Sequence, residues 1–288
     1  MEELNFNDAS CLNRGNMSLN CTMGAITLDP LSVKILNWMN WISISIGLPL
    51  IFIVMIAIFF QVKKGQEAPV YVINLLISDL IQLFSRIPVD LCRLSQTDFT
   101  YMKIVYACIK ASVGFMVCIS CERYLVVAMP MWYRFRRNIK TYVVVCIVVW
   151  LLPLFYPLLA YVFKEYGMAA HFFIAFLLLP IPLFIFFLVG TIKALSGAVS
   201  VPADEKRRIA AIQVVVLIIY TLLYLPIILL LLYDINALEG ELSCIPYSVG
   251  YAAGALSPLA DTTLYVFFRK SILDTFLASL SCCKISSN

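Results

Sequence analysis

Glutamate and arginine stand side by side at the end of an apolar run, in the stretch CISCERYLVVAMPMWYRFRR that covers residues 118–137. A buried charge without a partner costs several kcal/mol, so Glu122 and Arg123 need either water or each other nearby. The adjacent carboxylate can pair with the guanidinium, and a cation held at a membrane boundary can be released toward an incoming partner. The alternative is an ordinary arginine that extends its side chain to water at a helix end.

A second group of charged residues lies upstream of this pair. Lys103, Tyr106 and Lys110 recur at the spacing i, i+3, i+7, which places them on one face of a helix. Lys110 would lie two turns inside the span, too deep for its ammonium group to reach water easily. If that face points into a bundle, it predicts a cationic pocket with aromatic walls. Aromatic residues of two later segments could line it: Tyr224, Tyr247 and Tyr251.

One further cation, Arg86, has two interpretations. Asp90 follows it by four residues, so on a helix the two side chains can pair with each other. Contact between Arg86 and a ligand is the other interpretation, and the sequence does not favour it over the pair.

Composition identifies the elements that must position these residues. The 288-residue chain is 62% hydrophobic and 13% charged, whereas soluble domains are roughly 45–50% apolar and about 25% charged. A membrane span needs about 20 apolar residues and must be helical to satisfy its backbone hydrogen bonds. Seven segments qualify: 36–62, 69–91, 100–127, 141–163, 172–195, 211–233 and 245–268. The sequence therefore predicts an all-α membrane protein, a seven-helix bundle over 35–268.

The distribution of charge predicts how the bundle is oriented. Basic residues gather in one set of loops and in the stretch after the last span, which the positive-inside rule places in the cytosol. With seven spans, the tail 1–34 then lies outside the cell. Sequons at Asn16 and Asn20 agree and predict glycosylation. Residues 269–288 are expected to form a short amphipathic helix on the membrane surface and a cytosolic tail. The prediction is a multi-pass plasma-membrane protein.

The ten cysteines divide by location. Those in the spans are interpreted as small apolar filler. Cys282 and Cys283 follow the surface helix and are either palmitoylated or unmodified thiols. Four others face the oxidising exterior, and three pairings among them stay open: Cys11, Cys21, Cys92 and Cys244.

Motifs in order along the chain resemble the rhodopsin-like (class A) G-protein-coupled receptors. ERYLVV closes the third span, NLLISDL places Asp79 in the second, and LYLP places Pro226 in the sixth. DTTLY, from Asp261 to Tyr265, stands where that family has an Asn/Asp-Pro-x-x-Tyr motif. The resemblance covers essentially the whole chain.

The resemblance implies roles for the cytosolic motifs. Arg123, between Glu122 and Tyr124, would leave its acidic neighbour and contact a heterotrimeric G protein. Tyr265 would swing inward on activation. Tyr224 stands where the family commonly has a switch tryptophan, next to Pro226. No bound cofactor is expected apart from an ion.

The same resemblance implies that a sodium pocket lies in the middle of the membrane. Asp79, Ser112, Ser257 and Asp261 match its spacing, and hard oxygen ligands suit a hard monovalent cation. Two carboxylates in hydrocarbon repel each other unless a cation or a proton joins them. The alternative is one carboxyl group that stays protonated and hydrogen-bonded to serine.

Departures from the family concern the ligand. Asp98 stands near the position of the usual extracellular cysteine, so the family's disulfide is not expected. Val105 occupies the place of the aspartate that binds amines, which disfavours a biogenic amine. A small anionic ligand fits the predicted pocket better: a lipid acid, a carboxylate metabolite or a nucleotide, as in the branch with an aspartate in the seventh-helix motif.

These features favour a receptor that transmits binding of an extracellular ligand to heterotrimeric G proteins, with lipid around it. Two alternatives stay open: a non-signalling or weakly coupling seven-helix receptor, which acts as a scavenger or regulatory partner, and a small seven-helix transporter. An enzyme is disfavoured because no nucleophile–base pair or metal-ligand cluster is evident. The net charge of +4 is too small to indicate nucleic-acid binding.

Overall fold

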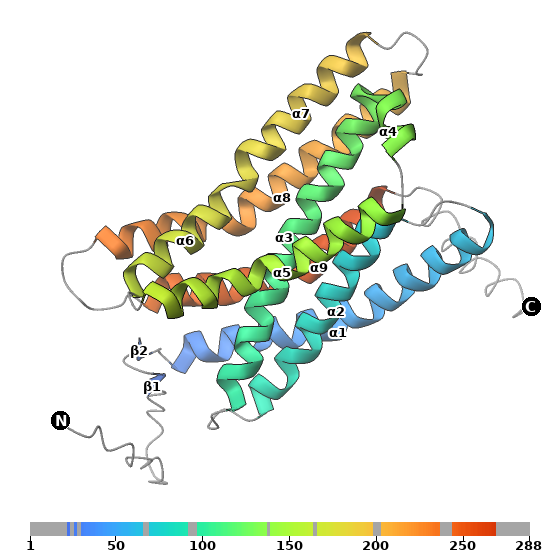
Figure 1. Ribbon diagram of the computed structural model, residues 1–288. Coiled ribbons are helices and arrows are strands. Elements are labelled where there is room, and N and C mark those ends of the chain that lie inside the picture. Colours follow the sequence, from blue (N-terminus) through green and yellow to red (C-terminus); the bar gives the residue numbers. More distant parts are fainter. Residues whose placement is uncertain are drawn as a thin grey trace, which may run out of the picture.

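The chain folds into a bundle of α-helices in a computed structural model (Figure 1). Backbone structure is described for residues 22–23, 26–27, 30–65, 69–91, 97–136, 139–163, 166–197, 203–236 and 244–268. Side chains are described within 34–65, 69–87, 101–135, 139–153, 171–196, 209–232 and 249–263, with a few gaps. The surface helix expected after residue 268 lies outside the described residues.

Each of the seven apolar segments is helical, which confirms the predicted fold class. The helices that contain them are α1 (Pro30–Lys63), α2 (Val70–Leu91), α3 (Thr97–Ala128), α5 (Ile139–Phe163), α6 (Tyr166–Leu178) with α7 (Pro180–Gly197), α8 (Ala203–Asn236) and α9 (Cys244–Phe268). Among the described residues, five helical stretches are long and apolar enough to cross a membrane, and Ile139–Pro153 is a shorter apolar one.

The fifth predicted span is divided at one residue. Leu179 forms a turn between α6 and α7, and Pro180 begins α7. Proline has no N–H and its ring crowds the carbonyl of the residue four positions earlier, so the helix is interrupted there. The two helices still follow one another along one path (Figure 1).

Two elements were not expected from the sequence. A seven-residue helix, α4 (Pro130–Arg136), follows α3 directly after Met129. In the N-terminal region, β1 (Thr22–Met23) pairs antiparallel with β2 (Ile26–Thr27), with Thr22 opposite Thr27. Both elements are too short to have shown a periodic signal.

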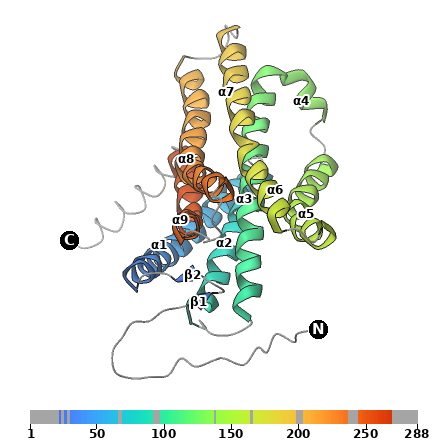
Figure 2. The same cartoon turned by 90° about the vertical axis from the view of Figure 1, so that its left-hand side faces the viewer.

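Helix α3 is the central element of the bundle. It contacts α2, α4, α5, α7 and α8, while α1 packs on α2 and α9. In two views at right angles, α4 and the end of α7 lie at the same end of the bundle as the end of α3 (Figures 1 and 2). This end carries the Glu-Arg-Tyr motif, so α3 joins the motif to the interior of the bundle.

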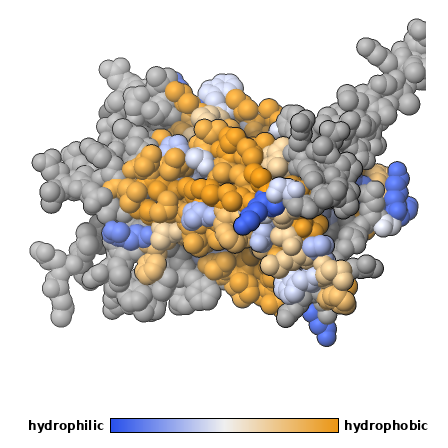
Figure 3. All heavy atoms as spheres, turned by 90° about the horizontal axis from the view of Figure 1, so that it is seen from above, coloured by the Kyte–Doolittle hydropathy of each residue, from blue (hydrophilic) through white to orange (hydrophobic). Residues whose placement is uncertain are grey.

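The outer surface of the bundle is apolar. Large hydrophobic side chains such as Phe59 on α1, Val144 on α5 and Leu222 on α8 are more than half exposed. Figure 3 shows apolar side chains over most of the described surface on one face. Lipid would shield these side chains from water, as expected for membrane-spanning helices.

Candidate functional site

At the end of α3, the carboxylate of Glu122 is held by two tyrosines. Tyr133 of α4 donates its hydroxyl to Oε1 at 2.6 Å, and Tyr142 of α5 donates to the same oxygen at 3.0 Å. The two tyrosine oxygens lie 2.7 Å apart. Burial, together with the hydrogen bonds to Glu122 and Tyr142, raises the pKa of Tyr133, so its hydroxyl keeps its proton at neutral pH. We call these three residues the acid clamp.

The clamp leaves the neighbouring arginine on the surface. Arg123 is exposed, and among the described side chains no ion pair joins it to Glu122. The expected pairing of the two residues is thus replaced by hydrogen bonds from tyrosines that follow Glu122 by 11 and 20 residues. The guanidinium is available at this end of the bundle, beside α4.

Tyr124, the third residue of the motif, packs against α7. Its ring lies 5.8 Å from the rings of Phe186 and Phe187. A Cβ atom at Gly190 would come within 2.5 Å of the Tyr124 ring, so only glycine leaves room for it without a shift. This close approach fixes the distance between α3 and α7 directly below the motif.

The expected cation site is brought together in the middle of the bundle. Asp79 of α2 and Asp261 of α9 are almost fully buried. Ser112 of α3 donates to Oδ1 of Asp79 at 2.9 Å and lies 2.7 Å from the hydroxyl of Ser78. Oδ2 of Asp79 and both carboxylate oxygens of Asp261 have no hydrogen-bond partner among the described residues. Three buried acceptor atoms without donors are the environment that a bound cation or added protons would satisfy.

Ser257, the fourth expected residue, is reached through a proline in α9. Pro258 has no N–H, so the carbonyl of Gly254, four residues earlier, loses its helical donor. The side-chain amide of Gln82 donates to this carbonyl and, at 3.2 Å, to the Ser257 hydroxyl. Ser257 also donates to the Gly254 carbonyl at 3.3 Å. The carbonyl that Pro258 leaves without a helical donor is therefore bonded by Gln82, which joins α9 to α2 about one helical turn from the two carboxylates.

Asp79, Gln82, Ser257 and Asp261 form a line of buried polar side chains between α2 and α9, which we call the polar seam, and Arg86 extends it outward. Arg86 is only 2% exposed, donates to Oδ1 of Asn40 at 3.4 Å, and its guanidinium carbon lies 5.2 Å from the centre of the Tyr251 ring. A Cβ atom at Gly254 would lie 2.8 Å from Nη2, so glycine leaves space for the guanidinium. The structure gives Arg86 a position inside the bundle between α1, α2 and α9, and Asp90 has no described side chain.

Lys110 is the second buried cation. It is 7% exposed, and its ammonium nitrogen lies 5.3 Å from the centre of the Phe173 ring on α6. Tyr106 is half-buried against the core, whereas Lys103 is exposed. The three residues that were predicted to share one helix face thus differ in exposure, and among them only Lys110 is fully buried. Tyr247 has no described side chain.

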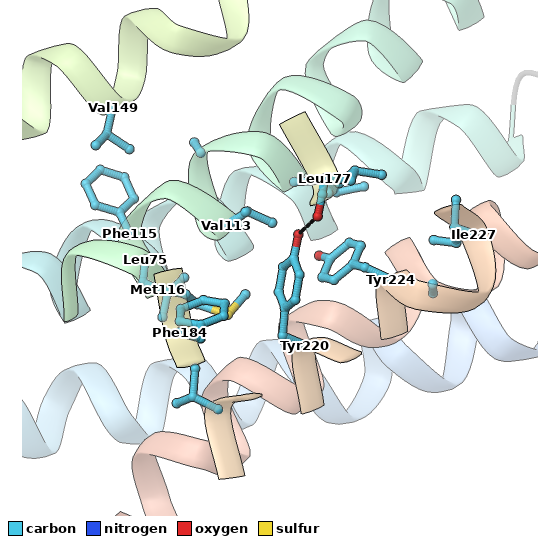
Figure 4. Close-up of a cluster of buried hydrophobic side chains, with 14 of the residues drawn as sticks. Leu75, Val113, Phe115, Met116, Val149, Leu177, Phe184, Tyr220, Tyr224 and Ile227 are labelled. Carbon is cyan, nitrogen blue, oxygen red and sulfur yellow. Dashed lines mark hydrogen bonds between the residues drawn. The ribbon is translucent and has the colours of Figure 1, made fainter. Parts of the chain in front are cut away.

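An aromatic cluster supports the bundle where α6 meets α7. Tyr220 of α8 donates its hydroxyl to the carbonyl of Leu177 at 2.7 Å, close to the break before Pro180 (Figure 4). Its ring lies 4.7 Å from that of Tyr224 and 5.2 Å from that of Phe184. The cluster places Tyr224 in the core, and Pro226 follows on the exposed side of α8.

Sequence reasoning did not identify Gln82, Gly254 or Asn40 as parts of the seam. A signal was present, since Asp79, Gln82 and Arg86 recur at i, i+3, i+7 in a mainly apolar helix, as do Gly254, Ser257 and Asp261. Several expected modification and switch residues lie outside the described side chains: Asn16, Asn20, Cys11, Cys21, Cys92, Cys244, Tyr265, Cys282 and Cys283.

Comparison with known proteins gives one family and several relatives. The sequence profile described as "7 transmembrane receptor (rhodopsin family)" matches residues 52–169. The chain is 27% identical to proteinase-activated receptor 2 of Rattus norvegicus over 82% of this chain and 69% of the relative. It is 24% identical to proteinase-activated receptor 1 of Xenopus laevis over 83% and 64%. Similarity to the type-1 angiotensin II receptor of Homo sapiens is 31% over 35% and 30%. The chain therefore spans about two thirds of the proteinase-activated receptors and under a third of the angiotensin receptor.

Proposed function

We propose that this chain is a rhodopsin-like seven-transmembrane receptor that transmits the binding of an extracellular ligand to a heterotrimeric G protein. It is a non-enzymatic, multi-pass protein of the plasma membrane. The proposal places the end of α3 and α4 in the cytosol and the N-terminal tail outside, as the distribution of basic residues predicts.

The exposed Arg123 carries the proposal. A cation at the cytosolic mouth of the bundle can contact a partner only if its acidic neighbour does not hold it. Tyr133 and Tyr142 supply two hydroxyl donors to Glu122, and hydrogen bonds to an ionised group are the stronger kind. The acid clamp therefore favours the state in which Arg123 is available to the G protein.

For the ligand we propose a small molecule or segment that presents a carboxylate or phosphate group. Lys110 and Arg86 lie inside the outer half of the bundle, and each faces an aromatic ring, Phe173 and Tyr251 respectively. An anion would lower the cost of these buried charges, whereas a cationic amine would raise it. The relatives are named for a proteinase and for angiotensin II, and a ligand carried by a peptide is compatible with the same anionic group.

We also propose that Asp79 and Asp261 share a sodium ion or a proton in the resting state. Ser112 and Ser257 would complete an oxygen-lined site, and the three carboxylate oxygens that have no donor among the described residues support it. Movement of α9 relative to α2 on activation would separate the carboxylates and release the cation.

The test is a panel of G-protein dissociation sensors in cells, with the unmodified receptor, Arg123→Ala and Lys110→Gln at matched surface expression. Lys193→Gln, which changes an exposed lysine of α7, is the control. The proposal expects signal with at least one G-protein subtype from the unmodified receptor and the control, and baseline signal from Arg123→Ala. Lys110→Gln should retain basal signal and lose the response to an anionic ligand.

Two results would count against it. Equal signal from Arg123→Ala and the unmodified receptor would remove the arginine from the coupling mechanism. Silence of the unmodified receptor with every subtype would favour the non-signalling alternative, in which the fold binds a ligand or partner without exchange activity.

A further inference from the structure

The segment from the end of α3 to the first residues of α5, residues 129–140, exposes large apolar side chains at the end of the bundle. Phe135 is 85% exposed, Ile139 80% and Met131 69%, and Trp132 is about half exposed. Exposed apolar groups of this size on one short segment are unusual at a surface that faces only water. They need a covering partner.

The acid clamp determines which way this segment faces. Tyr133, in the middle of α4, is drawn inward to Glu122 and Tyr142 by its hydroxyl. Met131, Trp132 and Phe135 lie on the same helix and remain exposed, so α4 has an anchored inner face and an apolar outer face. The outer face is thus held in place by α3 and α5.

The apolar surface of this segment continues into the lipid-facing surface of α5. Ile139, Val143 and Ile147 recur every four residues and are all about half exposed or more. Because α5 contains one of the predicted membrane spans, we expect this stripe to meet the hydrocarbon, and its first residue belongs to the segment. Continuity with the lipid-facing surface points to the bilayer as the partner.

Charge supplies the second argument. Residues 129–140 contain Arg134, Arg136, Arg137 and Lys140 and no acidic residue. Aromatic and aliphatic side chains interleaved with arginine and lysine are typical of segments that lie in a membrane interface and bind anionic headgroups.

We propose that α4 and the first residues of α5 bind anionic phospholipid headgroups at the membrane surface, with Phe135 and Ile139 inserted at the acyl boundary and Lys140 beside the phosphates. The bound lipid would hold α4, and through Tyr133 the acid clamp, in its observed arrangement. The inference uses the membrane-spanning fold, and it does not require that the receptor couples to a G protein.

The test uses the full-length receptor in lipid nanodiscs and the fluorescence of Trp132. Brominated phospholipids quench an indole only at short range, and the signal of Trp132 is the difference between the unmodified receptor and Trp132→Phe. Brominated phosphatidylserine and brominated phosphatidylcholine are compared at equal mole fraction. We expect stronger quenching by phosphatidylserine, reduced at high salt because the attraction is screened.

Substitutions locate the effect. Lys140→Gln should raise the phosphatidylserine fraction needed for half-maximal quenching about fivefold, the usual contribution of one basic residue near an anionic surface. Lys193→Gln is the control and should leave it unchanged. The salt dependence of quenching in the unmodified receptor tests the same electrostatic attraction without any substitution in the segment.

Three results would overturn the proposal. One is equal quenching by the two lipids, and another is quenching by neither. The third is a Trp132 signal that lipid leaves unchanged and added G protein alters, which would assign the surface to a protein partner. Lipid selectivity in a receptor that fails every exchange assay would leave this inference standing while the proposed function fails.

Discussion

Removing one of the two buried carboxylates should abolish stabilisation of the receptor by sodium. Asp261→Asn keeps the volume of the side chain and removes one of the charges that a cation would neutralise. Asp261 contributes two of the three carboxylate oxygens that have no donor among the described residues. The same loss is expected for Asp79→Asn, which also alters the oxygen that accepts from Ser112.

The magnitude follows from linkage. A ligand at ten times its Kd stabilises the state that binds it by about 1.4 kcal/mol. That free energy corresponds to a rise of about 3–6 °C in the unfolding temperature of a domain of about 150–250 residues. The assay is thermal unfolding of the purified receptor in sodium chloride and in N-methylglucamine chloride at equal ionic strength. Both aspartate variants should show the same unfolding temperature in the two salts.

A control variant tests whether loss of the sodium response is specific to the two carboxylates or follows from removing any buried polar group. Thr191→Val removes a buried hydroxyl of α7 that has no partner among the described residues, so it should be neutral or mildly stabilising and keep the sodium response. Acidification should weaken the sodium response of the unmodified receptor, because protons compete for the same oxygens. A sodium response that persists in both aspartate variants would refute the reasoning.

Three further results are expected. Tyr133→Phe should lower basal G-protein activation up to about fivefold, because the carboxylate of Glu122, which keeps only the hydroxyl of Tyr142, can pair with Arg123 in a surface ion pair of up to about 1 kcal/mol; an increase in a nucleotide-exchange assay would contradict this. Gly190→Val should displace the ring of Tyr124 and lower both the unfolding temperature and the exchange rate, and unchanged values would show that the ring can move freely. Tyr220→Phe should lower the free energy of unfolding by about 1–2 kcal/mol in a thermal assay, because a buried carbonyl beside the helix break loses its donor; no change would mean that another donor replaces it.

The helices were predictable because their signal is local. A run of about 20 apolar residues can satisfy its backbone in lipid only as a helix, and each of the seven runs is helical. The break at Leu179 was marked by Pro180 and Pro182, yet prolines also occur within α1, α8 and α9 without ending them. Whether a proline bends or interrupts a helix depends on contacts such as the one between Tyr220 and Leu177, which join distant segments.

The site was predictable where the family motif names single residues and not where the contacts are long-range. The resemblance placed Asp79, Ser112 and Asp261 together, and the structure buries all three. It also suggested an ion pair between Glu122 and Arg123, because the two residues are adjacent. The carboxylate instead accepts hydrogen bonds from hydroxyls of α4 and α5. No local sequence pattern predicts that tyrosines 11 and 20 residues after Glu122 contact its side chain.

The most direct test of the coupling mechanism is GDP release from a purified heterotrimeric G protein by the receptor in nanodiscs, with empty nanodiscs as baseline. The account predicts faster release with the unmodified receptor for at least one subtype and baseline release with Arg123→Ala. Equal acceleration by both proteins would contradict it, because the exposed guanidinium at the end of α3 would then take no part in exchange.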